Sequence, residues 1–144
     1  DLPAGNVIDI PLLSNQVASN ALWYQTRHGR KLLIGPGVAL GFVRPANFER
    51  FYNENSLLLF FSSFPRKDEL PDTTINPAHI LELIDMGFKF VIHHRKQSAI
   101  SGGSKANETK TLFKASQKLR KIFGNPLIAC KEVEVYDLKN AVEH

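Results

Sequence analysis

The fold of this chain is decided by residues 76–95, which read N-P-A-H-I-L-E-L-I-D-M-G-F-K-F-V-I-H-H-R. Asn76 is a suitable helix N-cap, Pro77 suits a first helical position that needs no amide donor, and Gly87 suits the left-handed residue that ends a helix. Apolar side chains recur between them at helical spacing: Ile80, Leu83 and Ile84. Residues 88–92, F-K-F-V-I, are typical of a buried strand. A helix joined to a strand through one Gly predicts a parallel or mixed sheet.

Other segments predict the rest of an α/β domain. Strand patterns occur at residues 6–12 and 32–34, and a terminal antiparallel hairpin is predicted over 127–138. Amphipathic helices are predicted from Ser14 to the turn at His28 and Gly29, from Pro45 onward, and over 109–123; residues 57–61 alone also fit a buried strand. We therefore expect an α/β fold with a four- to five-stranded mixed sheet, helices on its faces and a C-terminal antiparallel hairpin.

Length and composition indicate one domain over residues 1–144 with a sizeable apolar core. No stretch approaches the roughly 20 apolar residues of a membrane-spanning helix, so we expect the domain itself to be soluble. Met86 is the single methionine, so we expect Asp1 to result from processing or from excision out of a longer membrane protein. The single cysteine, Cys130, cannot form an internal disulfide or a cysteine-based metal site, and we expect it to be a small buried side chain.

The net charge of +4 permits a phosphate-rich partner but is more typical of an ordinary solvated surface. Basic residues gather at 27–31, 93–96 and 105–121. The last group lies on a predicted helix that has no interleaved aromatic residues or groove-reading motif, so nucleic acid is a weak alternative partner. Its candidate contacts are Lys114, Lys118 and Lys121.

Catalytic and metal-binding patterns are sparse. His93 and His94 are adjacent on a predicted strand and point to opposite faces, so no metal site and no cofactor is expected. Asp9 ends the first predicted strand and His93 or His94 ends another, so these side chains could meet at the carboxyl edge, where open α/β sheets place their sites. An acid–base pair is conceivable there, but a hydrogen-bonded structural His is favoured because no nucleophile elbow is present. The Gly-rich residues 101–105 lack the spacing of a phosphate loop.

Four segments together resemble the C-terminal domain that follows the membrane helices in bacterial polytopic proteins of the glycosyltransferase C or dolichyl-phosphate mannosyltransferase-like type. They are V-I-D-I-P-L (7–12), Y-Q-T-R-H-G-R-K-L-L-I-G (24–35), M-G-F-K-F-V-I-H-H-R (86–95) and I-F-G-N-P-L-I-A-C-K-E-V-E-V-Y-D-L (122–138). The matching motif positions are Tyr24, Thr26, His28, Gly29, Gly35, Gly87, His93, Gly124 and Tyr136. Two departures are Leu32, where Pro is common, and Phe90, where Tyr is usual.

The resemblance implies a domain on the outer face of the bacterial cell membrane that carries no catalytic residue, because the catalytic acids of such proteins lie between their membrane helices. It implies contact with the parent's membrane helices and with an acceptor glycan or a lipid-linked sugar phosphate. The binding residues would be Arg27, His28, Arg30 and Lys31, together with His93, since clustered donors suit phosphate or sugar hydroxyls. A plain surface turn at His28 is the stronger reading of that segment.

Three functions follow as hypotheses. The first is a non-catalytic accessory domain of a membrane glycosyltransferase-like protein. The second is a small self-contained α/β enzyme or nucleotide-binding domain that uses Asp9, His28 and His93. The third and weakest is a basic nucleic-acid-binding module, whose binding would depend steeply on salt.

Overall fold

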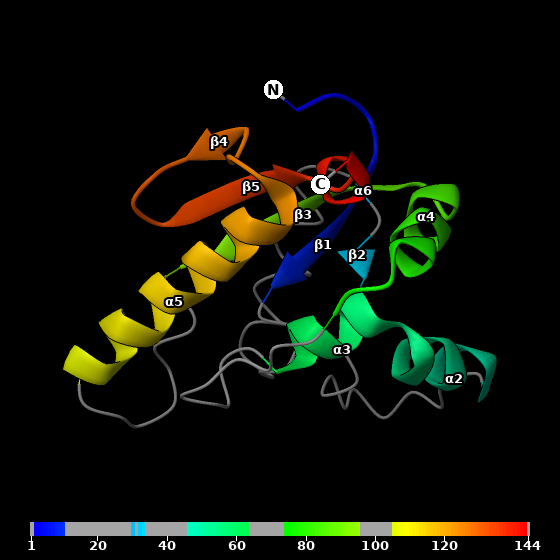
Figure 1. Ribbon diagram of the computed structural model, residues 1–144. Helices are drawn as coiled ribbons and strands as arrows, with labels where there is room; N and C mark the ends of the chain where they lie inside the picture. The colour runs from blue at the N-terminus through cyan, green and yellow to red at the C-terminus, as the bar shows by residue number, and fades with distance from the viewer. Residues whose placement is uncertain are drawn as a thin grey trace.

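The computed structural model describes residues 2–10, 30, 32–33, 46–63, 74–95 and 105–143. The predicted helix from Ser14 to the turn at Gly29 lies outside these residues, as do residues 101–104 of the Gly-rich segment. In the described part, five strands form one sheet in the order β2-β1-β3-β5-β4 (Figure 1). The strands are β1 (Asn6–Ile10), β2 (Leu32–Leu33), β3 (Phe88–His94), β4 (Ile128–Ala129) and β5 (Val133–Asp137).

The sheet is mixed, and this confirms the predicted α/β class. β1 is parallel to both β2 and β3, whereas β5 is antiparallel to β3 and to β4. The antiparallel pair β4–β5 is the predicted C-terminal hairpin. The Arg95 amide donates to the Glu132 carbonyl at 2.7 Å and the Leu138 amide to the Lys89 carbonyl at 2.8 Å, so the hairpin is attached along the whole length of β3.

The described helices are α2 (Ala46–Glu54), α3 (Ser56–Ser62), α4 (Pro77–Asp85), α5 (Lys105–Phe123) and α6 (Asn140–Glu143). The segment after Pro45 is helical, as predicted, but it is divided at Asn55, whose side chain caps α3. Residues 57–61 belong to α3 and are not a strand. Helix α5 begins at Lys105, ahead of the predicted start at 109, because Lys105 and Ala106 are good helix formers.

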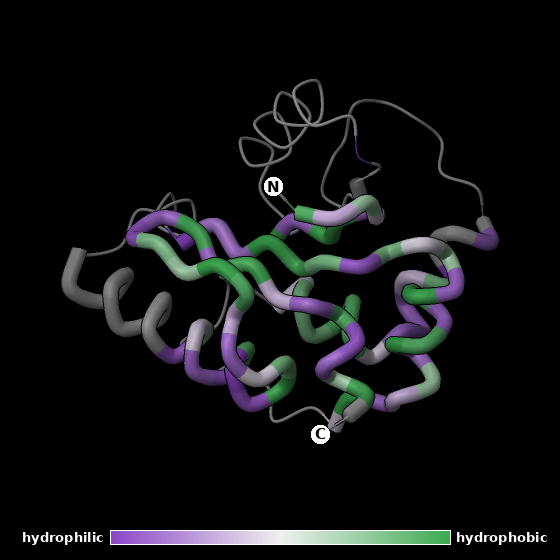
Figure 2. The backbone as a smooth tube through the Cα atoms, turned by 90° about the horizontal axis from the view of Figure 1, so that it is seen from above, coloured by the Kyte–Doolittle hydropathy of each residue, from purple (hydrophilic) through white to green (hydrophobic). Residues whose placement is uncertain are grey.

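The described helices α3 to α6 pack on one side of the sheet, which we call the helix face. Strand residues on this face are Ile8, Ile10, Val91 and Tyr136, and the helices bury against them Leu57, Leu58, Phe61, Ile80, Leu83, Ala115, Leu119 and Phe123. The opposite side, the second face, carries a smaller cluster of Val7, Phe90 and Val135, with Leu2 packed against it. Figure 2 shows the N-terminal segment and the C-terminal end of the chain on opposite sides of the sheet.

The turn between α4 and β3 has the predicted caps. The Asn76 side chain accepts a hydrogen bond from the Ala78 amide at 3.0 Å, and Pro77 occupies the start of the helix. Gly87 has a φ of 86°, and its amide donates to the Ile84 carbonyl at 2.8 Å. The Gly87 carbonyl accepts from the Asn6 amide at 2.9 Å. The helix end therefore also begins the pairing of β1 with β3.

A bulge next to this turn places Phe88 and Phe90, which are two residues apart, on opposite faces of the sheet. Asn6 pairs with Phe88 and Val7 with Phe90, so Lys89 is an extra residue on β3. Phe88 consequently joins the cluster on the helix face, while Phe90 packs on the second face.

The expectation for Cys130 was wrong, because this side chain is exposed. Cys130 follows the two-residue edge strand β4, whose residues are exposed. An apolar run at the edge of a sheet is not covered on both faces, as the same run would be in a central strand.

We predict that Gly87→Ala destabilises the domain by roughly 1–2 kcal/mol, because a left-handed backbone conformation costs about that much for a residue with a Cβ. A Cβ at this position would also lie 3.1 Å from Nδ2 of Asn6. Urea unfolding followed by circular dichroism measures the effect. Gly87→Asn should cost less, since Asn tolerates this conformation better. Equal stability of the Ala variant and the wild type would contradict the assigned role of Gly87.

Candidate functional site

The main polar cluster of the described residues lies on the helix face, between β3, β5 and α5. His93 of β3 and Glu134 of β5 are directly opposite each other in the antiparallel pairing, and both are completely buried. Tyr136 lies two residues beyond Glu134 and so projects to the same side of the strand. Helix α5 adds Ser116 and Arg120, which are four residues apart and therefore share one face of that helix.

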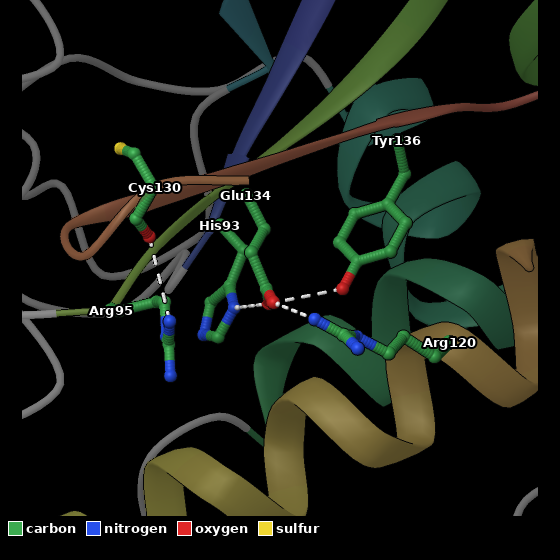
Figure 3. Close-up of polar contacts among 6 residues, drawn as sticks. All are labelled: His93, Arg95, Arg120, Cys130, Glu134 and Tyr136. Atoms are coloured by element: carbon green, nitrogen blue, oxygen red, sulfur yellow. Dashed lines mark hydrogen bonds and ion pairs between the residues drawn. The ribbon is translucent and has the colours of Figure 1, made fainter. Parts of the chain in front are cut away.

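The Glu134 carboxylate is the centre of this cluster (Figure 3). Its Oε1 accepts a hydrogen bond from Arg120 Nη2 at 2.9 Å, and its Oε2 accepts one from the Tyr136 hydroxyl at 3.0 Å. The His93 Nδ1 lies 3.3 Å from the same Oε2. Three side chains from two strands and one helix thus bind one carboxylate.

Burial alone would raise the pKa of Glu134, but hydrogen bonds from His93, Arg120 and Tyr136 outweigh it and hold the pKa well below its ordinary value. The buried Ser116 hydroxyl has no hydrogen-bond partner of good geometry among the described residues, yet it lies near enough to contribute to this lowering. Burial, followed by the charge of Glu134, raises the pKa of Tyr136. Glu134 is therefore ionised and Tyr136 neutral at physiological pH.

Exposure decides what this cluster can do chemically. The side chains of His93 and Glu134 are 0% and 1% exposed, whereas that of Arg120 is 49% exposed. A general acid or base must reach the proton that it transfers, directly or through one water. A carboxylate enclosed by its own donors fits a structural role, in which it joins β3, β5 and α5.

Tyr136 extends this junction into the apolar core. Its ring centroid lies 5.7 Å from that of Phe123, and Phe123 lies 6.2 Å from Phe61 in a stacked arrangement. These rings connect β5 to α5 and α3. The Tyr136 hydroxyl therefore donates to the Glu134 carboxylate, while its ring packs in the apolar core.

The predicted meeting of Asp9 with a His at the sheet edge occurs with His94. The His94 Nε2 lies 3.2 Å from Asp9 Oδ1 on the second face, and both side chains are largely buried. His93 does not take part, because Ile10 rather than Asp9 pairs with it and its side chain lies on the helix face. The expected convergence of Asp9 with His93 is therefore wrong, and His28 lies outside the described residues.

Of the predicted binding residues Arg27, His28, Arg30 and Lys31, the structure describes Arg30. Its guanidinium donates to the carbonyl oxygens of Leu2, Pro3 and Gly5 at 2.6, 2.7 and 2.9 Å. The guanidinium carbon also lies 5.7 Å from the centroid of the Phe90 ring, a cation–π contact. Arg30 thus attaches the N-terminal segment to the second face.

Other classes of site have little support in the described part of the chain. No three His, Cys, Asp or Glu side chains gather there as a metal ion would require. No helix there has the length and apolar character needed to cross a bilayer. On α5, Lys114 and Lys121 are exposed and Lys118 is half-buried, which fits a solvated helix surface.

Comparison with known proteins gives no relative. No protein-family model, curated protein or solved structure matches this chain.

Glu134, Arg120 and Ser116 were not among the site residues predicted from the sequence. A signal for Glu134 was present, because the alternation in V-E-V-Y puts it in phase with Tyr136 and opposite to the valines. A carboxylate in the same phase as a buried aromatic residue indicates a buried charge that needs a partner. The partners on α5 could not be identified without the tertiary structure.

We predict that Glu134→Gln destabilises the domain by about 3 kcal/mol at neutral pH, because charge-assisted hydrogen bonds in a buried site are lost. The stabilisation by Glu134 is present above pH 4.5, the ordinary pKa of Glu, and is lost as the pH falls toward its depressed value in the folded state. The gap between wild type and variant should therefore narrow below pH 4.5. Urea unfolding across pH measures both effects.

The matched control is Glu82→Gln, the same substitution at an exposed position of α4. It should change the free energy of unfolding by less than about 0.5 kcal/mol. Equal effects of the two substitutions would show that Glu134 is not the centre of a stabilising network.

Proposed function

We propose that this chain is a non-catalytic accessory domain of a membrane glycosyltransferase-like protein. The observation that carries the proposal is the shared engagement of His93 and Tyr136 with the buried Glu134. Both residues occupy motif positions of the family that the sequence resembles, and both side chains are buried in the core. A catalytic His would need access to a substrate.

Two further motif positions support the same reading. Gly87 and Gly124 have φ angles of 86° and 71° and follow α4 and α5. Left-handed Gly residues at helix ends are requirements of the backbone and not of chemistry. The described motif residues thus specify how the helices join the sheet and hairpin, as expected when shared residues preserve a fold whose catalytic centre lies elsewhere.

In the proposed parent protein, membrane helices precede this domain and an acceptor glycan or a lipid-linked sugar phosphate lies beside it at the outer membrane face. The contacts of Arg30 with Leu2, Pro3 and Gly5 would then fix the direction in which the chain enters the domain. Arg27, His28 and Lys31 remain the proposed donors for phosphate or sugar hydroxyls.

The proposal predicts that the full natural reading frame encodes membrane helices ahead of Asp1. Expressed whole, the product should stay in the membrane pellet after an alkaline wash, which removes peripheral proteins. The isolated domain should show no glycosyl transfer. Release of the full-length product into the soluble fraction would contradict the proposal.

A second candidate is a self-contained α/β enzyme or nucleotide-binding domain, and the contact between Asp9 and His94 favours it. This pair lies at the carboxyl ends of the parallel strands β1 and β3, where ligands of open α/β sheets bind. His94 takes the role first assigned to His93.

This candidate predicts that a nucleotide raises the Tm of the isolated domain and that Asp9→Asn removes the rise. Circular dichroism must show that the variant remains folded. Under the accessory-domain proposal, neither wild type nor variant responds to nucleotides.

A further inference from the structure

A polar pocket lies between α2 and α4, and the described residues that line it include none of the binding or catalytic candidates discussed above. Its volume is about 380 Å³, within the roughly 300–1,000 Å³ typical of small-ligand pockets. Helix α2 lines it with residues spaced i, i+3, i+4 and i+7, which form one stripe of a helix. The lining residues are Asn47, Arg50, Phe51, Glu54, Asn55, His79 and Glu82.

The base of the pocket is held rigidly by the junction of α2 and α3 against α4. The Asn55 side chain accepts from the amides of Leu57 and Leu58 at 3.2 and 3.1 Å, and its Nδ2 donates to the His79 carbonyl at 3.0 Å. The Ser56 hydroxyl accepts from the Asn76 amide at 2.9 Å. The bonds from Asn55 and Ser56 fix the junction of α2 and α3 to the start of α4. The pocket is therefore formed before a ligand arrives.

The same junction fixes the hydrogen-bonding character of His79. The Ser56 amide donates to His79 Nδ1 at 2.9 Å, and the Ser56 hydroxyl oxygen lies 3.0 Å from the same nitrogen. Nδ1 is therefore an acceptor, and the neutral ring carries its proton on Nε2. His79 thus offers a ring N–H donor from a defined orientation.

The lining combines donors and acceptors with little net charge. Arg50 and His79 supply donors, Glu54 and Glu82 supply carboxylate acceptors, and half-buried Phe51 supplies an apolar wall. Two carboxylates against one guanidinium disfavour a phosphate or other anion. The polar lining equally disfavours a purely apolar ligand. Sugar hydroxyls donate and accept at once, and sugar rings have apolar faces, so they match this combination.

We propose that the pocket between α2 and α4 binds a neutral sugar unit, with Glu54, Glu82 and Arg50 bonding to its hydroxyls. The site uses none of residues 27–31, and its assignment does not depend on the membrane parent. Sugar binding by the isolated domain and membrane retention of the full-length protein are separate measurements, so each proposal can fail alone.

The test is a titration of the ¹⁵N-labelled domain, followed by two-dimensional NMR, with glucose, galactose, mannose, N-acetylglucosamine and lactose as neutral probes. Glucosamine and inorganic phosphate serve as cationic and anionic probes. At least one neutral sugar should give saturable shifts centred on α2 and α4. Glu82→Gln should weaken this binding by about tenfold, the effect of losing a hydrogen bond to a charged group.

The matched control is Asp85→Asn, which removes an exposed carboxylate one turn further along α4 and outside the pocket lining. It should leave the affinity unchanged. Three results would overturn the proposal: no saturable shift with any neutral sugar, response to glucosamine or phosphate alone, or equal binding by wild type and Glu82→Gln.

Discussion

The structure depends on one buried charge, the carboxylate of Glu134. Moving a carboxylate out of water costs several kcal/mol unless its oxygens are bonded. Here Arg120, Tyr136 and His93 satisfy them, from α5, β5 and β3 respectively. Each hydrogen bond to a charged group contributes roughly 1.5–3 kcal/mol. The desolvation cost is thereby offset only when the helix, hairpin and central strand are assembled together, so the network specifies their mutual arrangement.

The hydrogen bonds to Glu134 also explain why the C-terminal hairpin pairs with β3 in its observed register. β5 could in principle slide along β3, but a shift by one residue would turn Glu134 to the second face, away from Arg120, and would remove the ring of Tyr136 from its contact with Phe123. In the antiparallel half of the sheet, the Glu134 network therefore adds to the apolar burial that both halves share. His93 is buried and is held by the Glu134 carboxylate opposite it, so its arrangement fits a structural role better than a catalytic one.

Local features of the fold could be predicted from the sequence, and long-range ones could not. Asn76, Pro77 and Gly87 act through backbone groups a few residues away, so their cap and turn roles follow from residue type. The pairing of Asp9 with His94 needed the relative register of β1 and β3, which the bulge at Lys89 alters. The pocket between α2 and α4 needed the relative placement of two helices that are not consecutive in the chain. For the Glu134 cluster, the information available beforehand was the phase of Glu134 within V-E-V-Y.

The central role of the Glu134 carboxylate is tested most directly by titrating this side-chain carboxyl by ¹³C NMR, in a domain whose amide spectrum reports that it remains folded. We predict no change in the Glu134 resonance as the pH is lowered through 4.5, the ordinary pKa of Glu, for as long as the fold persists. A Glu134 resonance that titrates at or above pH 4.5 in the folded domain would contradict it, because the carboxylate would then lack the donors that the structure assigns to it.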